Sequence, residues 1–307
     1  MQHGLFGQVF LHFFELLPYL HARSIFPAWE IRSTFYGAPP DFITIPGVLD
    51  LAYPPPPAPY RRVHMRDLRA KHCQVLGNDW AELSRIWHAY FKIPDRVIQQ
   101  ADSLPSLDKA LGVHYRGTDK QTTSDDSNPI THDQYLTLLV EFLSTRPVIE
   151  RVFAATDEYT FVDKLRSAVN LPIVNLGEVG FHKAATNIDP RIKADRAVLD
   201  CLLLSRCCIT IETSSALPSF AKIFNPGLEL YRCAASKLFA DIPYFPVAYV
   251  PQISLTSLEA LNILKSTMAN DWTTNPKCQS FKAPFSYAPR NPVKSRLWEI
   301  AERLTGK

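Results

Sequence analysis

The sequence predicts an α/β protein in which a parallel sheet is covered by helices on both faces. From position 111 onward, short apolar runs alternate with helical patterns of about 10 to 13 residues, as in repeated strand–helix units. A helix of that length is the usual crossover between parallel strands, and strands buried on both faces read as nearly continuous apolar runs. The composition, with 46% hydrophobic and 21% charged residues, is that of a globular protein.

The expected strands and helices follow one another regularly after residue 110. The strand over 111–116 alternates its side chains between two faces, so that His114 and Arg116 share a face. A capping box at Thr131 begins the helix expected over 131–144. The remaining strands are expected over 151–155, 171–175, 207–212 and 228–231, and the remaining helices over 160–169, 193–205 and 214–224.

The part of the chain before residue 106 is expected to form a smaller α/β domain. Apolar residues at helical spacing predict a buried helix over 8–22, with a kink at Pro18. A second helical pattern covers 79–91, and between the two lie a proline-rich connection and a basic stretch at 61–71. We divide the chain into an N-terminal domain (1–105), a C-terminal domain (106–250) and a tail packing back across both (251–307), with tail helices over 254–268 and 291–303.

Composition and missing motifs exclude several classes of function. Lys and Arg number 33 against 30 Asp and Glu, and this net charge of +3 argues against a nucleic-acid-binding protein. No apolar run reaches the roughly 20 residues that a membrane-spanning helix needs. The sequence lacks the phosphate-loop, dinucleotide, hydrolase-elbow and zinc-peptidase motifs. The six cysteines have no metal-ligand spacing, and we expect reduced, buried thiols, or one or two disulfides in an oxidising compartment.

The N-terminus shows no export signal, because no basic segment there leads into an apolar stretch and a small-residue cleavage site. We therefore expect a cytoplasmic protein, or one of the secretory lumen if a signal or anchor precedes Met1.

Polar residues cluster where the first strand of the sheet ends. His114 and Arg116 end the strand, Gly117 makes the turn, and Asp119 and Lys120 follow. An arginine at a strand end is suited to a phosphate, because its planar fork donates two parallel hydrogen bonds. The carboxyl ends of parallel strands are also where such sheets bind ligands. The alternative is an exposed, charged turn without a ligand.

Asp157 follows the second strand of the sheet and is expected at the same edge. Its carboxylate is placed to orient Arg116 or to bind a ligand hydroxyl. The alternative is a helix N-cap, which also favours an acidic residue.

A third group lies between a strongly apolar helix and the strand that follows it. Asp200 is a charge within that helix, which is costly unless it has a partner. Either Arg196, one turn earlier, satisfies it locally, or it accepts hydrogen bonds from a guanine. Thr213, Ser214 and Ser215 form a strand-to-helix turn whose backbone N–H groups and hydroxyls suit an anion, unless they act as plain N-caps.

An arginine, a hydroxyl-lined helix N-terminus and a buried carboxylate along one sheet edge are what a nucleoside diphosphate requires. The sequence has no D-x-D motif that would hold a divalent metal against a diphosphate. We therefore expect neutralisation by arginine and backbone N–H groups, with no metal.

These segments resemble the three motifs of the α1,6-/protein O-fucosyltransferase superfamily. The segment from His114 to Lys120 is similar to its first motif, H-x-R-R-x-D, and the segment around Asp157 to its second. The segment from Asp200 to Ser215 is similar to its third motif, with the spacing of the α1,6 enzymes. A further segment resembles the glycine-rich first loop of the family's N-terminal domain, at Gly4, Gly7 and Gln8.

The resemblance, which is strong over about 111–225, implies a GT-B glycosyltransferase: two Rossmann-like domains facing a cleft, the N-terminal one short or truncated here. It further implies inverting, metal-independent transfer from GDP-fucose, held by the C-terminal domain, without another cofactor. In the implied roles, Arg116 binds the β-phosphate, His114 contacts the nucleoside, Asp200 reads guanine, Asp157 supports the arginine, and Ser214 and Ser215 hold phosphate oxygens.

The sequence departs from the family pattern in three places. Gly117 stands where the first motif usually has its second arginine, and the N-terminal loop lacks an asparagine. An acidic residue of the α1,6 enzymes falls at Ser124, which makes Asp125 and Asp126 the candidate proton acceptors.

We expect a fucosyltransferase that uses a nucleotide sugar and a glycan or protein acceptor. Two alternatives remain: a glycosyltransferase with another nucleotide sugar, and a catalytically degenerate GDP-binding or scaffold protein. The basic stretch at 61–71 lines the acceptor side, or is a solvated helix face.

Overall fold

The structure is a computed structural model. It describes residues 5–6, 11–30, 47–57, 63, 68, 72, 79–117, 130–177, 188–213, 215–234, 250 and 252–254.

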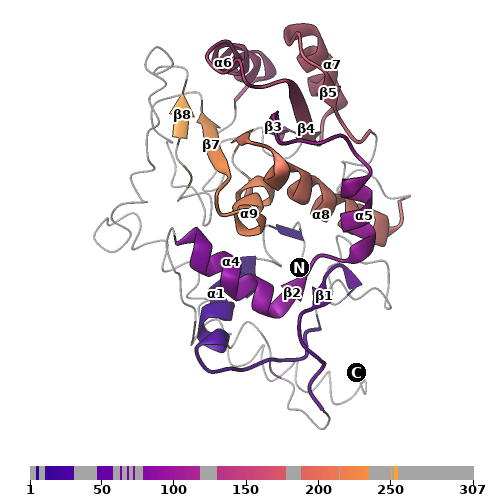
Figure 1. The fold of residues 1–307 in the computed structure, drawn as a ribbon, viewed down its shortest axis with the longest axis vertical. Helices are drawn as coiled ribbons and strands as arrows, with labels where there is room; N and C mark the ends of the chain where they lie inside the picture. Colours follow the sequence, from indigo (N-terminus) through magenta and orange to yellow (C-terminus); the bar gives the residue numbers. More distant parts are fainter. Residues whose placement is uncertain are drawn as a thin grey trace, which may run out of the picture.

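The core of the molecule is a six-stranded, entirely parallel sheet with β3 near its centre (Figure 1). The strand order is β5-β4-β3-β6-β7-β8. Counted along the chain from β3, this is the order 3-2-1-4-5-6 of the Rossmann fold. The predicted α/β class with a Rossmann-like parallel sheet is therefore confirmed. The strands are β3 (Ala110–Tyr115), β4 (Arg151–Thr156), β5 (Ile173–Val174), β6 (Ile209–Glu212), β7 (Glu229–Ala234) and β8 (Gln252–Ser254).

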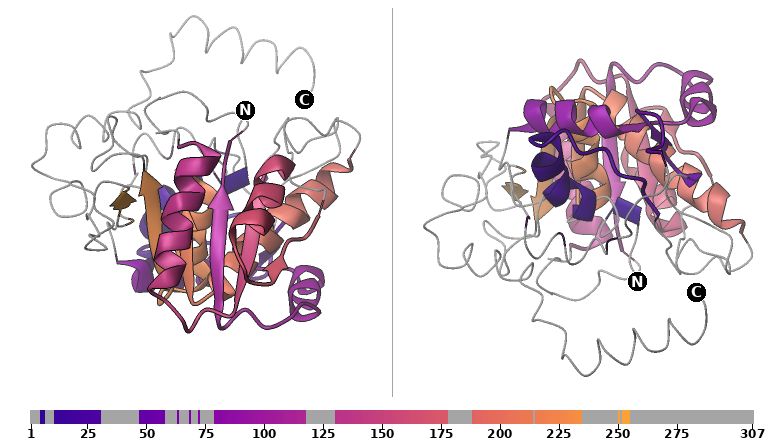
Figure 2. Two further views of the ribbon diagram at one scale, coloured as in Figure 1. Left: turned by 90° about the horizontal axis from the view of Figure 1, so that it is seen from above. Right: turned by 90° about the horizontal axis from the view of Figure 1, so that it is seen from below.

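Helices cover both faces of this sheet (Figure 2). One face packs against α6 (His132–Ser144) and α7 (Tyr159–Ala168), and the other against α8 (Pro190–Arg206) and α9 (Ala216–Phe224). Along β3 the apolar side chains alternate between the faces as predicted, because Leu111 belongs to the cluster under α6 and α7 and Ala110 to the cluster under α8.

Local sequence signals account for where two of these helices begin. The capping box before α6 is present, because Thr131 Oγ1 accepts from the Gln134 N–H (3.2 Å) and Gln134 Oε1 accepts from the Thr131 N–H (3.0 Å). Helix α8 begins at Pro190, earlier than the predicted 193. Its N-cap is Asp189, whose Oδ1 accepts from the Arg191 N–H at 2.7 Å.

The sequence analysis missed β8, which adds a sixth strand beyond β7. Its last residue, Ser254, was predicted to begin a helix, and that assignment is wrong. The rest of the predicted tail helices, over 255–268 and 291–303, lies outside the described residues.

The helices before Ala110 pack beneath α8 and α9 and extend the same core (Figure 1). Helices are present within the predicted ranges 8–22 and 79–91, at Leu11–His21 and Trp80–Tyr90, and the Asp79 side chain caps α4. The Trp87 and Phe220 rings, whose centroids are 5.3 Å apart, join α4 to α9. The N-terminal elements are α1 (Leu11–His21), β1 (Asp50–Leu51), α4 (Trp80–Tyr90), β2 (Phe91–Lys92) and α5 (Asp95–Asp102).

The strands described before Ala110 are β1 and β2, which pair antiparallel. The arrangement of two Rossmann-like domains around a cleft and the division at 105/106 and 250/251 therefore stay predictions. Within the described part of the chain, no helix combines the length and the apolarity that a bilayer crossing requires. The four cysteines described are unpaired thiols, three of them buried.

Candidate functional site

The candidate site lies where the connections from two neighbouring strands diverge. Strand β3 continues toward α6 on one face of the sheet, whereas β6, its neighbour, continues to α9 on the other face. In open α/β sheets this switch point forms a crevice at the carboxyl ends of the strands and is the usual place for a ligand. Two of the predicted motifs, at the end of β3 and the end of β6, therefore meet there.

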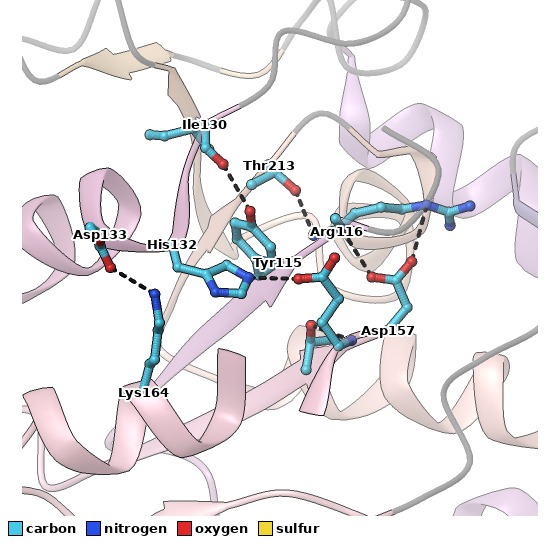
Figure 3. Close-up of polar contacts among 11 residues, drawn as sticks. Tyr115, Arg116, Ile130, His132, Asp133, Asp157, Lys164 and Thr213 are labelled. Atoms are coloured by element: carbon cyan, nitrogen blue, oxygen red, sulfur yellow. Dashed lines mark hydrogen bonds and ion pairs between the residues drawn. The ribbon is translucent and has the colours of Figure 1, made fainter. Parts of the chain in front are cut away.

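Thr213 holds the two strand ends together. Its N–H donates to the His114 carbonyl at 3.0 Å, and its Oγ1 accepts from the Arg116 N–H at 2.9 Å. The side chain is buried, so these bonds fix the backbone at Arg116 against the end of β6 (Figure 3). Thr213 thus positions the arginine-bearing turn, in addition to its predicted role in anion binding.

Asp157 supports the same turn from the neighbouring strand. Its Oδ1 accepts from the Gly117 N–H at 3.1 Å, and its Oδ2 lies 3.8 Å from Arg116 Nε (Figure 3). The N-cap of the following helix, α7, is Glu158, so the alternative interpretation of Asp157 as the cap is wrong. The expected contact between Asp157 and Arg116 is present.

His114 is a buried imidazole whose Nδ1 has no hydrogen-bond partner in the described structure. Burial and the nearby Arg116 guanidinium lower the pKa of His114 to about 3, although the Asp157 carboxylate opposes this. The ring is therefore neutral at neutral pH. A buried polar atom without a partner costs about 1–3 kcal/mol, and a ligand that bonds to Nδ1 would remove that cost.

Asp200 is paired with Arg196, which was one of the two interpretations predicted for this carboxylate. Arg196 Nε donates to Asp200 Oδ1 at 3.1 Å, and Arg196 Nη1 donates to the Leu176 carbonyl at 3.0 Å. Burial raises the pKa of Asp200, and Arg196 opposes the rise. The next residue, Cys201, bonds through Sγ to the Leu217 carbonyl in the first turn of α9 at 3.3 Å. Asp200 is thus close to the helix that begins at the switch point, and its contact with guanine stays a prediction.

Ser215 occupies the N-cap position of α9, but its side chain makes no capping hydrogen bond. The plain N-cap interpretation is therefore wrong for this hydroxyl. Its carbonyl accepts from Ser219 Oγ at 3.2 Å. A helix N-terminus beside Arg116 presents partial positive charge at the switch point.

Several predicted site residues lie outside the described part of the chain. The N-terminal loop is described at Leu5 and Phe6, and the Phe6 ring lies 5.3 Å from that of Phe220 on α9. This contact brings the loop to the helix that begins at the switch point. The predicted residues outside the description are Gly4, Gly7, Gln8, Asp119, Lys120, Asp125, Asp126 and Ser214.

The sequence analysis missed a buried polar row across the sheet. Glu212 at the end of β6 pairs in register with His114 on β3 and with Arg232 on β7. Its carboxylate accepts from Ser219 Oγ at 3.0 Å. Burial raises the pKa of Glu212, which Ser219 and Arg232 oppose, and burial lowers the pKa of Arg232 to about 9. A glutamate ending an otherwise apolar strand was the signal that could have indicated this row.

A second missed pair lies beside the turn at Gly117. His132 Nε2 and Glu158 Oε2 are 2.6 Å apart, and a Cβ built on Gly117 would overlap the Glu158 carboxylate. The space that a side chain at position 117 would enter is thus occupied by this carboxylate.

Comparison with known proteins gives low structural similarity to fucosyltransferases. No family model matches the chain, and no curated protein matches it. A NodZ α-1,6-fucosyltransferase soaked with GDP-fucose is 19% identical, with 46% of each chain covered and a TM-score of 0.33. Fucosyltransferase NodZ from Bradyrhizobium gives 19% identity, 46% of each chain and a TM-score of 0.32. POFUT1 in complex with GDP-fucose gives 14% identity over 47% of this chain and 44% of its own, with a TM-score of 0.32.

The chain thus spans about half the length of the solved structures it matches. A TM-score in this range establishes neither the fold nor the function. The fold class is established by the strand order and register of the sheet.

Proposed function

We propose that this chain is an inverting, metal-independent glycosyltransferase that moves fucose from GDP-fucose to a hydroxyl group of a glycan or protein. The observation that carries the proposal is the meeting of Arg116, Asp157 and Thr213 at the switch point of a Rossmann-ordered sheet. These residues come from the three segments that resemble the superfamily's motifs. The reaction proposed is the one that the resemblance implies. The switch point is where sheets of this strand order usually bind nucleotides.

The charge at this place suits a diphosphate leaving group. Arg116 is oriented by Asp157 and keeps 19% of its side chain exposed, so a ligand at the ends of the strands can reach it. The N-terminus of α9 adds backbone dipoles on the β6 side. As the sugar–phosphate bond breaks, negative charge grows on the β-phosphate, and donors already in place stabilise it without reorganising.

The nucleoside end of the donor would bind to buried polar groups. In this proposal these are the unpartnered Nδ1 of His114 and the carboxylate of Asp200, both of which are buried. A neutral imidazole can donate or accept one hydrogen bond, and a carboxylate can accept two from the guanine N1–H and amino group. Guanine recognition therefore requires Asp200 to share its carboxylate between the base and Arg196.

The proposal is tested first by ligand binding. A thermal-shift series with GDP, UDP and ADP should show stabilisation by GDP at concentrations that leave the melting temperature with UDP and ADP unchanged, because a ligand stabilises by RT ln(1 + [L]/Kd). Stronger stabilisation by UDP or ADP than by GDP would mean that the site binds a base other than guanine. It would support transfer from another nucleotide sugar.

Turnover is tested with GDP-fucose and an array of glycan and peptide acceptors. Arg116→Ala should lower transfer by about 10²–10³-fold, the usual cost of removing one donor to a developing negative charge. Lys109→Ala, at an exposed pair with Glu150, is the matched control and should keep the wild-type rate. GDP binding without transfer or hydrolysis would favour the degenerate binding protein, which the glycine at position 117 also suggests.

A further inference from the structure

Glu158 and His132 form a polar pair at the sheet edge that the predicted site residues do not include. His132 is the first residue of α6, and Glu158 is the N-cap of α7. His132 Nε2 lies 2.6 Å from Glu158 Oε2, and the two side chains are 16% and 15% exposed. Both groups are largely withdrawn from water, yet solvent or a small ligand can still reach them.

The carboxylate of this pair lies against the turn that carries Arg116. It occupies the space in front of Gly117, where any side chain would overlap it. Gly117 is held by Asp157, the neighbour of Glu158 in sequence, and Asp157 also lies beside Arg116. Glu158 is therefore a second carboxylate beside the arginine turn, and it is hydrogen-bonded to His132.

The imidazole of the pair is fixed by aromatic packing. The His132 ring packs edge-on against Tyr115 at a centroid distance of 4.7 Å (Figure 3). It also packs edge-on against Phe161 at 5.5 Å. A base is aligned when a third group orients its side chain, and the packed imidazole is placed to orient this carboxylate. A glycine at position 117 is what keeps the carboxylate next to the turn.

We propose that Glu158, positioned by His132, accepts the proton of the incoming hydroxyl group; this inference rests on the proposed glycosyltransferase function. The oxygen of the hydroxyl forms a bond to the anomeric carbon of the sugar. The bond from that carbon to the β-phosphate oxygen breaks, and its electron pair leaves with GDP. The proton of the hydroxyl passes to a Glu158 carboxylate oxygen and then to solvent. Glu158 thereby takes the role for which Asp125 and Asp126 are the candidates in the sequence.

The experiment uses hydrolysis of GDP-fucose, in which water is the acceptor, so that no acceptor needs to be known. Glu158→Gln keeps the shape and a hydrogen bond to His132 but cannot take a proton. It should lower kcat by about 10²–10⁴-fold, the usual contribution of a positioned acid or base. Its affinity for GDP and its melting temperature should match those of the wild type. Glu150→Gln, at an exposed pair, is the control and should hydrolyse at the wild-type rate.

Two further variants separate proton transfer from a structural role. Azide is an anionic nucleophile with no proton to lose, so it should restore GDP release to Glu158→Ala but not to Arg116→Ala. His132→Asn keeps a donor to Glu158 and should retain more activity than His132→Ala.

The outcomes distinguish this inference from the function on which it rests. If the wild type binds GDP but neither hydrolyses GDP-fucose nor transfers fucose, both fail together. If Arg116→Ala loses hydrolysis but Glu158→Gln does not, the function stands and the inference is wrong. The inference is also wrong if Glu158→Gln loses GDP affinity in proportion to kcat, or if azide affects the Glu158→Ala and Arg116→Ala variants alike.

Discussion

The two faces of the parallel sheet bury different kinds of side chain. Toward α6 and α7 the core is apolar and aromatic, with Tyr115, Tyr135 and Phe161 in mutual ring contact at 4.5–5.6 Å. Toward α8 and α9 the carboxyl ends of the strands bury His114, Glu212 and Arg232 side by side. Apolar residues of similar volume would often stabilise a fold as well as such charges or better. The polar face therefore suggests a role beyond stability, and it is the face next to α9 and the candidate site.

The largest effect on stability is expected from breaking the polar row. Arg232→Met removes the cation that is paired in register with Glu212 and leaves that carboxylate buried beside Ser219. The free energy of unfolding should fall by about 3–5 kcal/mol, measured by urea denaturation, because a buried charge loses its compensation. The double variant Glu212→Leu, Arg232→Met should regain at least half of the loss.

The exposed pair of Arg166 with Asp163 supplies the matched control for this prediction. Arg166→Met removes an arginine from a surface pair at 3.1 Å and should leave the denaturation midpoint nearly unchanged. A similar loss in both variants would mean that burial does not set the cost, and the contrast between the two faces would then not hold.

The contacts within the polar row of His114, Glu212 and Arg232 could not be predicted from the sequence, although the strands that carry them could. The strands β3 and β6 followed from alternation and short apolar runs, and Arg116 and Asp157 followed from the ends of strands. The neighbour relation of Glu212 and Arg232 depends on the register between β6 and β7, which no local pattern specifies. The same holds for His132 and Glu158, which lie 26 residues apart and meet because α6 and α7 begin at one edge.

The predicted boundaries of helices and strands were wrong where a capping residue or strand pairing sets them. The start of α8 is set by Asp189 and Pro190, whereas the predicted start at 193 used apolar spacing alone. Strand β8 has three residues, too few for a periodic signal, and exists because β7 offers it an edge. Tertiary contacts thus decided both features.

An effect that is smaller per pH unit is expected from the titration of His114. Its pKa of about 3 in the folded protein lies below the ordinary value of 6.5, so the unfolded chain binds the proton more tightly. Stability contributed by the neutral ring is therefore present above about pH 6.5 and is lost as the pH falls toward 3. The slope from this group alone is at most about 1.4 kcal/mol per pH unit.

The contribution is isolated by comparing the wild type with His114→Gln in urea denaturation between pH 3 and pH 7. Arg116 and Asp157 are the charged groups that act on His114, and they remain in the variant. The difference between the two stability curves should shrink or change sign toward low pH. Parallel curves would show that His114 has the same pKa folded and unfolded, and that the imidazole is not held neutral.

The smallest effect is expected on the apolar face, from Tyr135→Phe. The Tyr135 hydroxyl is buried and donates to the Ile211 carbonyl on β6 at 2.7 Å. Removing it should cost about 0.5–1.5 kcal/mol, the net value of one hydrogen bond, because the ring packing is kept. GDP affinity should be unchanged, since the hydroxyl bonds to Ile211 within β6, whereas Arg116 and Thr213 lie beyond the ends of β3 and β6. A loss of GDP binding at constant stability would mean that the Tyr135 hydroxyl is coupled through β6 to the candidate site, and that its role is not only to stabilise the core.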